Sequence, residues 1–407
     1  MERTSYFIEL EEKFGAHNYH PLPIVLAKGQ GSVVWDVEGK KYYDFLSAYS
    51  AVNQGHCHPK IINALINQAQ ILTLTSRAFY NNQLGKYEEF ITRYFGFDRV
   101  LPMNTGVEGG ETAIKLCRKW GYEVKGIEEN KVKIIFATGN FWGRTIGAIS
   151  SSTDKESTRN FGPFVPGYEI IPYDDLEALE KALKDKNVAG FMVEPIQGEA
   201  GVKVPKTGYL KSAYELCQKN NVLFIADEVQ TGLGRTGKKL CCDYESIKPD
   251  ILILGKALSG GTLPVSAVLA DDEVMLTLKP GQHGSTFGGN PLACVVAQAA
   301  ILAMEEENMV ENSFNMGEFF RNTIDSELIT KGGLATIVRG KGLLNAIVID
   351  DTHDKELAWK ICIKMAEKGL LAKPTHGNII RFAPPLVINE SQMNEGLEII
   401  IESIKSI

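Results

Sequence analysis

The chain has 407 residues, of which 44% are hydrophobic and 23% are charged, and its net charge is −7. This composition is typical of a folded protein that is long enough for two domains. The acidic balance argues against a nucleic-acid surface or an anionic-membrane surface, and no apolar run approaches the ~18 residues that span a bilayer.

The first 15 residues include several acidic side chains and no apolar core, so they resemble neither a secretory signal nor a transit peptide. Seven cysteines are scattered without a CxxC pattern, which indicates free thiols in a reducing compartment. We therefore expect a cytoplasmic protein, or a mitochondrial matrix protein if a transit peptide has been removed. Cys57 lies between two histidines, but no second cluster supplies further ligands, so no metal site is expected.

Residues 1–49 are expected to form an N-terminal arm and a β-hairpin. Two β-rich runs at 33–37 and 41–45 flank a Glu-Gly turn, which is the pattern of a short hairpin. The same segment carries several aromatic residues, including Tyr19 and Tyr49, and such residues normally pack against a core.

A glycine-rich turn at 103–110 opens a helix, since apolar residues recur at helical spacing from Ala113 to Trp120. Free backbone N–H groups and the helix dipole make this turn a candidate phosphate cradle. The turn matches neither a P-loop nor GxGxxG, so a nucleotide is not favoured. Gly110 should cost up to ~1 kcal/mol relative to Ala in the first helical turn, and the sequence offers no reason for it.

Four buried strands are expected in the middle of the chain, at 132–137, 190–193, 222–226 and 251–254, because each is a short apolar run. The loop after the first contains two aromatic residues and Arg144, which suits stacking on a flat ring and binding a carboxylate. An ordinary surface loop with a packed Trp explains these residues equally well.

Two carboxylates, Glu194 and Glu199, follow the second of these strands. They are a candidate acid–base pair, although acidic loop residues are usually solvated. Asp174 and Asp175 begin an amphipathic helix with a leucine face.

An acid and an amine follow the other two strands. Asp227 comes directly after the third, and one residue separates Lys256 from the fourth. In open α/β sheets, ligands bind at the carboxyl ends of the strands. The amine can form a Schiff base with an aldehyde, and the acid can keep a pyridine nitrogen protonated, which is the protein's share of pyridoxal phosphate catalysis. Either residue alone is more often a solvated lysine or a helix cap, so only the two together indicate a cofactor site.

Asn290 and Pro291 predict the N-cap and first residue of a helix that ends near residue 307. Beyond it we expect strands at 342–350 and 379–382. Arg381 lies inside the second of these strands and therefore needs a carboxylate partner, from the protein or from a substrate.

The expected helices of this last part run from about 354 to 368 and from about 390 to the end of the chain. Alternation of helix and short strand indicates a small α+β domain. The expected division is an arm and hairpin at 1–49, a large domain at 50–309 and a small domain at 310–407.

Seven motifs, spread almost from end to end, resemble those of class-III, pyridoxal 5′-phosphate (PLP)-dependent aminotransferases of fold type I. They are NQGHCHP at 53–59, FWGRT at 141–145, VEPIQGEAGV at 193–202, ADEVQTGLGRTG at 226–237, GKALSGG at 255–261, HGSTFGGNPL at 283–292 and RFAPPL at 381–386. The resemblance implies an α/β fold: a large domain with a mostly parallel sheet flanked by helices, plus a small C-terminal α+β domain. It also implies PLP as the cofactor and a homodimer with active sites at the subunit interface.

The resemblance also assigns roles at the cofactor. Lys256 would bind PLP covalently and later move a proton, and Asp227 would pair with the ring nitrogen. The remaining contacts would be Phe141 on the ring face, Gln230 at the phenolic oxygen, Gly106 and Val107 at the phosphate, and Ser285 and Thr286 at the phosphate of the neighbouring subunit.

The members that this chain resembles most transfer the δ-amino group of L-ornithine to 2-oxoglutarate. The products are glutamate and glutamate 5-semialdehyde, which cyclises to pyrroline-5-carboxylate and links ornithine to proline. The resemblance implies that Tyr19 and Arg144 hold the α-amino and α-carboxylate groups of ornithine. Glu199 would pair with Arg381 while ornithine is bound and would release Arg381 when 2-oxoglutarate binds. Tyr49 matches a position that separates ornithine enzymes from 4-aminobutyrate enzymes.

Two alternatives remain. One is a sister aminotransferase that acts on N-acetylornithine or 4-aminobutyrate with the same cofactor site, against which Tyr19 and Tyr49 argue. The other is a non-catalytic, partner-binding relative, against which intact Lys256, Asp227 and Gln230 argue. A nicotinamide dehydrogenase is a weaker candidate, because no GxGxxG follows a strand.

Overall fold

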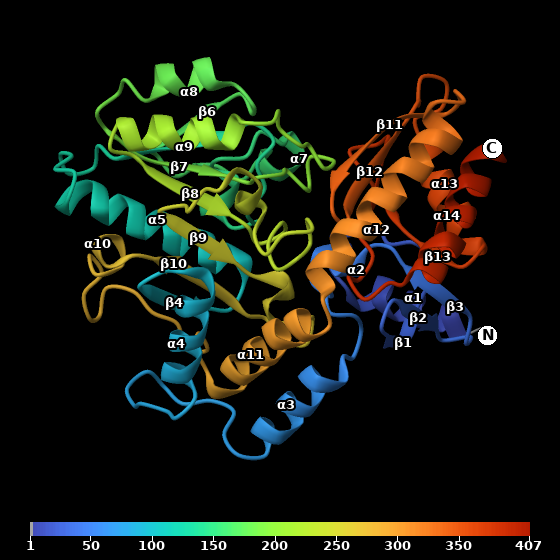
Figure 1. Cartoon of the computed structure of the whole chain (residues 1–407), viewed down its shortest axis with the longest axis horizontal. Coiled ribbons are helices and arrows are strands. Elements are labelled where there is room, and N and C mark those ends of the chain that lie inside the picture. The colour runs from blue at the N-terminus through green and yellow to red at the C-terminus, as the bar shows by residue number, and fades with distance from the viewer. Residues whose placement is uncertain (1–2) are drawn as a thin grey trace.

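The larger of two lobes is built around a seven-stranded sheet (Figure 1). The computed structural model describes residues 3–407. In spatial order the strands are β4 (Arg99–Met103), β10 (Ser266–Ala270), β9 (Ile251–Leu254), β8 (Leu223–Asp227), β7 (Val188–Val193), β5 (Lys133–Ala137) and β6 (Tyr168–Ile171). The five strands from β9 to β6 are parallel, and β10 is antiparallel to both neighbours. The expected mostly parallel central sheet is confirmed.

Alternate residues of the strands enter two separate cores. Ile134 and Phe136 of β5 pack in the core that contains α5 (Gly106–Glu123). Ile135 packs in the core that contains α8 (Leu176–Ala182) and α9 (Tyr209–Lys219). Successive side chains of a strand point to opposite faces, so helices must cover both sides of a sheet that is apolar throughout.

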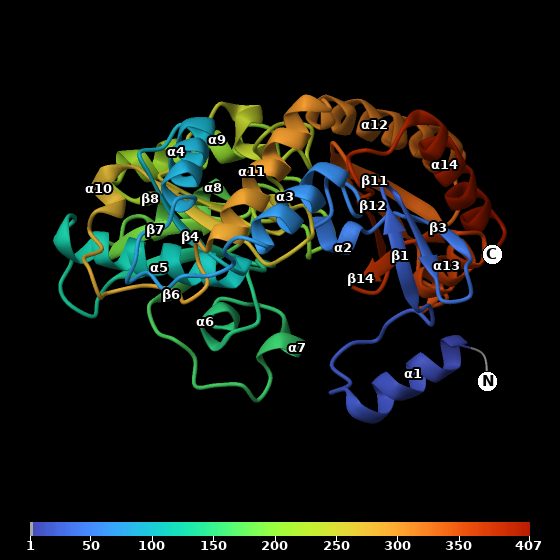
Figure 2. The ribbon, with the colours of Figure 1, turned by 90° about the horizontal axis from the view of Figure 1, so that it is seen from below.

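The smaller lobe contains an antiparallel four-stranded sheet in the order β11 (Ala335–Lys341), β12 (Leu344–Ile349), β15 (Ile379–Phe382), β14 (Lys373–Thr375). Three helices pack in this lobe: α12 (Met309–Ile324), α13 (Leu357–Glu367) and α14 (Glu390–Lys405). Figure 2 shows these elements gathered at one end of the molecule.

The first strands of the chain also lie in the smaller lobe. A third sheet has the order β1 (Leu26–Gln30), β2 (Val33–Asp36), β3 (Lys41–Asp44), β13 (Leu370–Leu371). Strands β1, β2 and β3 are antiparallel, whereas β13 joins β3 in parallel, so residues 26–44 share a sheet with residues 370–371. The domain boundaries at 49/50 and 309/310 stay a prediction.

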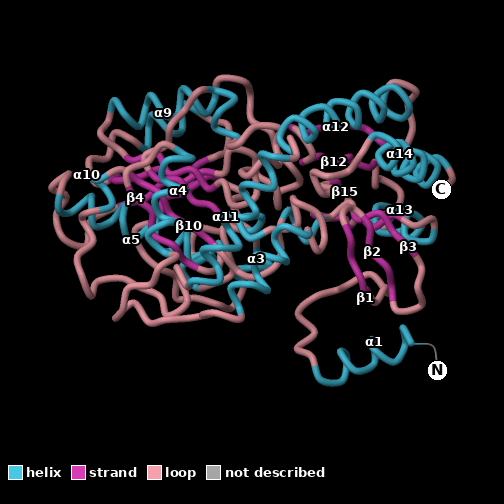
Figure 3. The backbone as a smooth tube through the Cα atoms, turned by 60° about the horizontal axis from the view of Figure 1, so that its bottom comes forward, coloured by secondary structure: helices cyan, strands magenta, loops and turns pink. Residues whose placement is uncertain are grey.

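The remaining elements include one long, largely buried helix, α11 (Pro291–Glu306), and several shorter or more exposed ones. Helix α1 (Arg3–Phe14) has no buried residue and projects from the edge of the smaller lobe (Figure 3). The N–H and the hydroxyl of Thr4 donate to Oε1 of Glu38, in the turn between β2 and β3, at 3.0 and 3.2 Å. The others are α2 (Ser47–Ser50), α3 (Pro59–Ala69), α4 (Leu84–Phe95), α6 (Ile146–Ile149), α7 (Lys155–Thr158), α10 (Asp272–Met275), the 3₁₀ turns Cys241–Glu245 and Lys256–Ser259, and the π turn Asp325–Ile329.

Most expected elements are confirmed to within a few residues, and two begin later than expected. The strand expected from 342 begins at Leu344 because Gly342, with φ +51°, forms the turn between β11 and β12. The helix expected from 354 begins at Leu357 because the Asp354 carboxylate instead accepts the N–H of Glu356. Asn290 caps α11 as expected, its side chain accepting from the N–H of Ala293 at 2.8 Å.

Gly110, which the sequence left unexplained, lies against the indole ring of Trp142. A Cβ at Gly110 would be 2.5 Å from Cε3 of Trp142, which is closer than packed atoms come. Trp142 is buried and donates from Nε1 to the Ser151 hydroxyl at 2.8 Å, so the ring has little room to shift. The glycine is therefore required by packing between α5 and the loop after β5.

We expect Gly110→Ala to lower the free energy of unfolding by roughly 1–3 kcal/mol, although Ala is the better helix former. The reason is overpacking against Trp142. Urea unfolding followed by fluorescence measures the effect. The matched control is Gly85→Ala in α4, where no atom lies within 4 Å of the added Cβ, and there we expect unchanged or higher stability. Equal behaviour of the two variants would contradict this explanation.

Within residues 3–407, no helix is both long and apolar enough to cross a membrane. The same part of the chain contains no group of three or more His, Cys, Asp or Glu side chains that could share a metal ion. All seven cysteines are free, and six of them are buried.

Candidate active site

Asp227 and Lys256 meet at the carboxyl edge of the sheet. Asp227 is the last residue of β8 and pairs in register with Ile253 of β9, three residues before Lys256. A cavity of about 420 Å³ opens at this edge. It is lined by Lys256, by the start of α5 at Thr105 and Gly106, and by residues around 261–265. The topology thus brings the amine and the glycine-rich turn to one cavity.

Lys256 has a left-handed backbone with φ +45°, which is costly for a residue with a Cβ and is typical of functional positions. Burial lowers the pKa of its amine, and the charge of Arg381 adds to this, whereas Glu199 and Asp227 act in the opposite direction. A lowered pKa favours the neutral amine, which is the nucleophilic form.

Asp227 is a buried carboxyl group that lacks a cationic hydrogen-bond partner within residues 3–407. It is 6% exposed, and its Oδ1 accepts the N–H of Val229 at 3.1 Å. Burial raises the pKa of Asp227 to about 6, against the effects of this hydrogen bond and of Lys256. A protonated ring nitrogen would supply the missing partner.

Three further observations fit PLP. Thr105 caps α5 and shares a capping box with Glu108. The N–H groups of Gly106 and Val107, at the very start of the helix, donate to no atom of the described chain. The buried Oε1 of Gln230 also has no partner among these residues. An anion at the helix start and a polar ring beside Gln230 would satisfy all of these groups.

The Phe141 backbone is tied to a buried carboxyl group. Its N–H donates to Oε1 of Glu194 at 2.9 Å. Burial raises the pKa of Glu194 well above the ordinary value, and the charge of Asp227 adds to the effect. The sequence alone suggests that Glu194 is solvated or belongs to an acid–base pair. Its side chain is instead buried, at 7% exposure. It therefore acts as a positioning group for the Phe141 loop.

Arg144 extends from the same loop. Its guanidinium carbon is 5.3 Å from the centroid of the Phe141 ring, and its Nη1 donates to the Ser157 hydroxyl at 2.8 Å. No carboxylate of residues 3–407 forms an ion pair with Arg144, so its charge is available to a ligand.

Arg381, in contrast, is paired. Its Nη1 donates to Oε1 of Glu199 at 2.8 Å, and Nε2 of Gln230 donates to the same oxygen at 3.3 Å. Arg381 is 2% exposed, and its guanidinium carbon lies 4.8 Å from the Tyr49 ring centroid. Burial alone would raise the pKa of Glu199, but Arg381 and Lys256 outweigh it and lower the pKa. The structure thus brings together Glu199, Gln230, Arg381 and Tyr49.

Three predicted residues lie outside this cluster. Tyr19 is on the arm between α1 and β1 and is 76% exposed. Ser285 accepts from Nδ2 of Asn104 at 2.9 Å, and Thr286 is exposed, but neither lines the cavity that contains Lys256.

Sequence reasoning missed Arg235, which is fully buried and, with Arg381, is one of the two largest such side chains among residues 3–407. It donates to the Asn53 side chain, at 2.6 and 3.1 Å, and to the backbone oxygens of Leu343 and Pro384, at 2.9 and 2.6 Å. Burial lowers its pKa to about 9, while Asp44 acts in the opposite direction. An arginine among glycines in a loop is usually solvated, so the sequence does not predict that Arg235 joins three separate segments of the chain.

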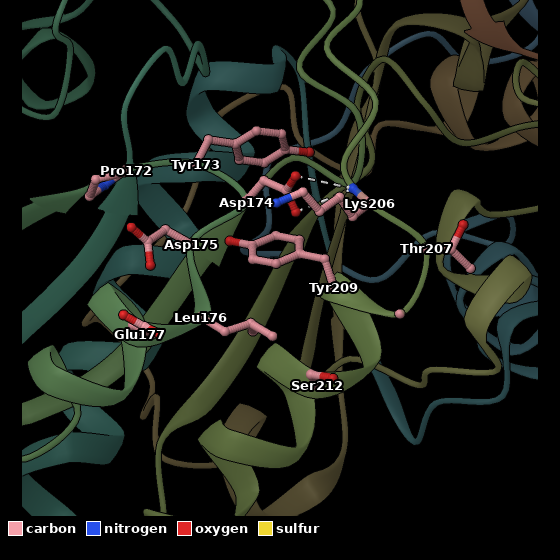
Figure 4. Close-up of a pocket in the computed structure, with 11 residues that line it drawn as sticks. Pro172, Tyr173, Asp174, Asp175, Leu176, Glu177, Lys206, Thr207, Tyr209 and Ser212 are labelled. Carbon is pink, nitrogen blue, oxygen red and sulfur yellow. Dashed lines mark hydrogen bonds between the residues drawn. The ribbon is translucent and has the colours of Figure 1, made fainter.

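A larger cavity, of about 600 Å³, lies elsewhere, between the starts of α8 and α9 (Figure 4). Its lining includes Tyr173, Tyr209 and the acidic residues Asp174 and Asp175. It contains none of the predicted site residues. The chemistry therefore belongs to the smaller cavity at Lys256.

A mostly parallel sheet that presents a lysine and an acid beside a helix start defines the class of PLP-dependent enzymes of fold type I. The aminotransferase class-III family model matches residues 14–404. The chain belongs to this family of PLP-dependent transaminases.

The names of the similar proteins include two substrates, ornithine and acetylornithine. The mitochondrial ornithine aminotransferase of Drosophila melanogaster is 64% identical over 99% of this chain and 92% of its own length. The structure of the Toxoplasma gondii ornithine aminotransferase, with PLP at partial occupancy, has a TM-score of 0.98 at 50% identity over 99% of this chain and 94% of that chain. The acetylornithine aminotransferase of Elizabethkingia anophelis has a TM-score of 0.92 at 58% identity over the full length of both chains.

Proposed function

We propose that this protein transfers the δ-amino group of L-ornithine to 2-oxoglutarate, giving glutamate and glutamate 5-semialdehyde, which cyclises to pyrroline-5-carboxylate. The observation that carries the proposal is the ion pair between Arg381 and Glu199 beside Tyr49. A donor with one carboxylate needs one cation, whereas an acceptor with two needs two. Arg381 is a second cation that Glu199 can cover for the donor and release for the acceptor, which suits this exchange of substrates.

We propose the following roles at the cofactor. When bound, PLP supplies an aldehyde that takes up the amino group and a ring that withdraws electrons from the reacting carbon. Lys256, whose amine has a lowered pKa, holds and returns the proton at Nζ. Asp227 would keep the proton on the ring nitrogen, and Phe141 would cover the ring face. The start of α5 holds the phosphate.

The proposed substrate roles separate the two arginines. Arg144 binds the α-carboxylate of ornithine, with Tyr19 at the α-amino group, so that the δ-amine reaches Lys256. Glu199 meanwhile covers Arg381. When 2-oxoglutarate binds, Glu199 leaves Arg381 and both arginines bind carboxylates.

We expect Glu199→Ala to reduce the preference for L-ornithine over L-glutamate as amino donor by about 10- to 100-fold. The reason is that the uncovered Arg381 then attracts the α-carboxylate of L-glutamate, which lies beside the reacting amine. This change in preference corresponds to about 1.4–2.7 kcal/mol. The ratio of kcat/KM for the two donors measures it. The control is Glu402→Ala, which breaks the exposed pair with Lys368. An unchanged donor ratio in Glu199→Ala would remove the switch while leaving the cofactor assignment intact.

The test of the function is a visible absorbance spectrum of the holoenzyme before and after L-ornithine is added without acceptor. We expect the cofactor band near the visible edge to disappear with L-ornithine and to return with 2-oxoglutarate. If the band does not change with L-ornithine but disappears with 4-aminobutyrate, the amino donor is 4-aminobutyrate and the family assignment stands. A protein that shows no band after incubation with PLP would contradict the cofactor roles.

N-acetylornithine is the second candidate donor, favoured by the acetylornithine aminotransferase of E. anophelis at 58% identity. The acetyl group blocks the α-amine that Tyr19 is proposed to hold. The same spectrum with N-acetylornithine separates the two donors.

We also propose a homodimer in which Ser285 and Thr286 reach the phosphate of the neighbouring subunit. Exposed apolar side chains support an interface: Phe287, next to Thr286, is 56% exposed, and Tyr80 of another loop is 105% exposed. Light scattering coupled to gel filtration tests the dimer. The mitochondrial name of the Drosophila relative supports the matrix alternative for the compartment, and the cytoplasmic prediction has no support of this kind.

A further inference from the structure

Four consecutive residues without a glycine, Ser47 to Ser50, form a left-handed turn that carries Tyr49. Their φ angles are 48°, 47°, 60° and 71°. The turn closes through the N–H groups of Ala51 and Val52, which donate to the oxygen of Ser47 at 2.9 and 3.1 Å. Left-handed helical backbone is unfavourable for L residues because Cβ approaches the next carbonyl oxygen. Such a turn persists where the surrounding contacts hold it, and it is common at functional sites.

Asp44, 7% exposed, holds the start of this turn. Its Oδ1 accepts the N–H groups of Leu46 and Ser47, each at 2.8 Å. Its Oδ2 lies 2.7 Å from Nε2 of His56, which fixes the orientation of the carboxylate. One buried side chain therefore sets the direction in which the chain enters the left-handed turn.

The turn and Arg381 belong to one packed unit. The backbone oxygen of Phe45 accepts the N–H of Ala383, two residues after Arg381, at 2.7 Å. The guanidinium of Arg381 in turn faces the Tyr49 ring at 4.8 Å. The position of Tyr49 on Arg381 therefore depends on the short path of the chain from Phe45 to Tyr49, which Asp44 controls.

We propose that Asp44 is a positioning residue for donor selection, because it holds the left-handed turn that places Tyr49 against Arg381. This inference rests on the proposed function. Tyr49 covers the face of the guanidinium and Glu199 covers its edge, so a donor carboxylate beside the reacting amine is kept from Arg381. Without Asp44 the turn relaxes toward ordinary backbone, the ring leaves the guanidinium, and L-glutamate gains relative to L-ornithine.

The experiment measures the second-order rate constants of the holoenzyme with L-ornithine and with L-glutamate, from the loss of the cofactor band. We expect Asp44→Ala to lower the ratio of the two constants at least tenfold. Asp44→Asn keeps an oxygen that accepts both N–H groups, so its ratio should stay within twofold of wild type. The melting temperature of every variant is measured in parallel.

Ala48 provides a pair of variants that change the turn without touching Asp44. Its side chain is exposed, so substitution buries nothing. Ala48→Val disfavours left-handed backbone and should lower the ratio in the same direction as Asp44→Ala. Ala48→Gly accepts this backbone without strain, so it should raise the melting temperature and keep the ratio.

Asp36 is the matched control, because it holds a different turn by the same chemistry. Its Oδ1 accepts the N–H groups of Glu38 and Lys40 at 3.0 and 2.8 Å, in the hairpin between β2 and β3. Asp36→Ala should lower the melting temperature and leave the donor ratio unchanged.

A ratio within twofold of wild type in both Asp44→Ala and Ala48→Val would overturn the proposal. Equal losses in Asp44→Ala and Asp44→Asn would also overturn it, since they would assign the effect to the negative charge of Asp44, which acts on Arg235, and not to the turn. If Asp44→Ala does not fold, Ala48→Val decides the question. Failure of the proposed function is distinct, because wild-type holoenzyme would then not react with L-ornithine at all.

Discussion

Replacing Lys256 by Ala should abolish turnover, with a loss on the order of 10⁴-fold or more, because it removes both the amine that binds the cofactor and the group that moves the proton. The visible absorbance of the cofactor linked to lysine should disappear as well, which separates this variant from one that is only slow. Single-turnover kinetics with L-ornithine and the spectrum of the purified variant are the two measurements.

Two controls make the Lys256 result specific. Lys256→Arg keeps a positive charge among Glu199 and Asp227 but offers no amine for the aldehyde, so it should be as inactive as Lys256→Ala. Lys248→Ala removes an exposed lysine that pairs with Asp271 and should leave activity unchanged. Residual turnover within a hundredfold of wild type in Lys256→Ala would show that another group carries the chemistry.

Replacing Asp227 by Asn should lower kcat by about 10²–10³-fold, the range for loss of one electrostatic stabiliser in a buried site. The amide keeps the shape of the side chain but cannot hold the proton on the ring nitrogen. Asp250→Asn is the control, because Asp250 sits at the opposite end of β9 and caps the sheet through the N–H of Phe224 at 2.7 Å. A variant with wild-type kcat would contradict the role of Asp227.

The pKa of Asp227 also predicts a pH dependence for cofactor binding. Burial raises this pKa to about 6, so in the cofactor-free protein the group is neutral below that pH. Pairing with a protonated ring nitrogen requires the carboxylate, and binding then releases a proton. Affinity for PLP should therefore fall as the pH drops below about 6, by up to tenfold per unit. Asp227→Asn should lose this dependence, and equilibrium titration with PLP checks both.

The features that the sequence predicts best are local. The short apolar runs identify β5, β7, β8 and β9 because each is buried on both faces and needs no long-range information. Asp227 and Lys256 could be placed together because parallel strands end at one edge. The pairing of Glu199 with Arg381, 182 residues apart, came only from resemblance to a family.

The features that could not be predicted depend on contacts between distant segments. Gly110 makes sense only beside Trp142, and the burial of Glu194 only beside the Phe141 loop. The left-handed turn has no glycine or asparagine to indicate it, because the Asp44 carboxylate and not local propensity stabilises it. Arg235 likewise needs acceptors from three separate segments.

The pairing of β3 with β13 has a consequence for how the protein is synthesised. The strands made first complete their sheet only when residues 370–371 leave the ribosome, so the N-terminal hairpin must wait with an open edge while the large sheet forms. During this interval the open edge of the hairpin is accessible to chaperones and to wrong strand pairing.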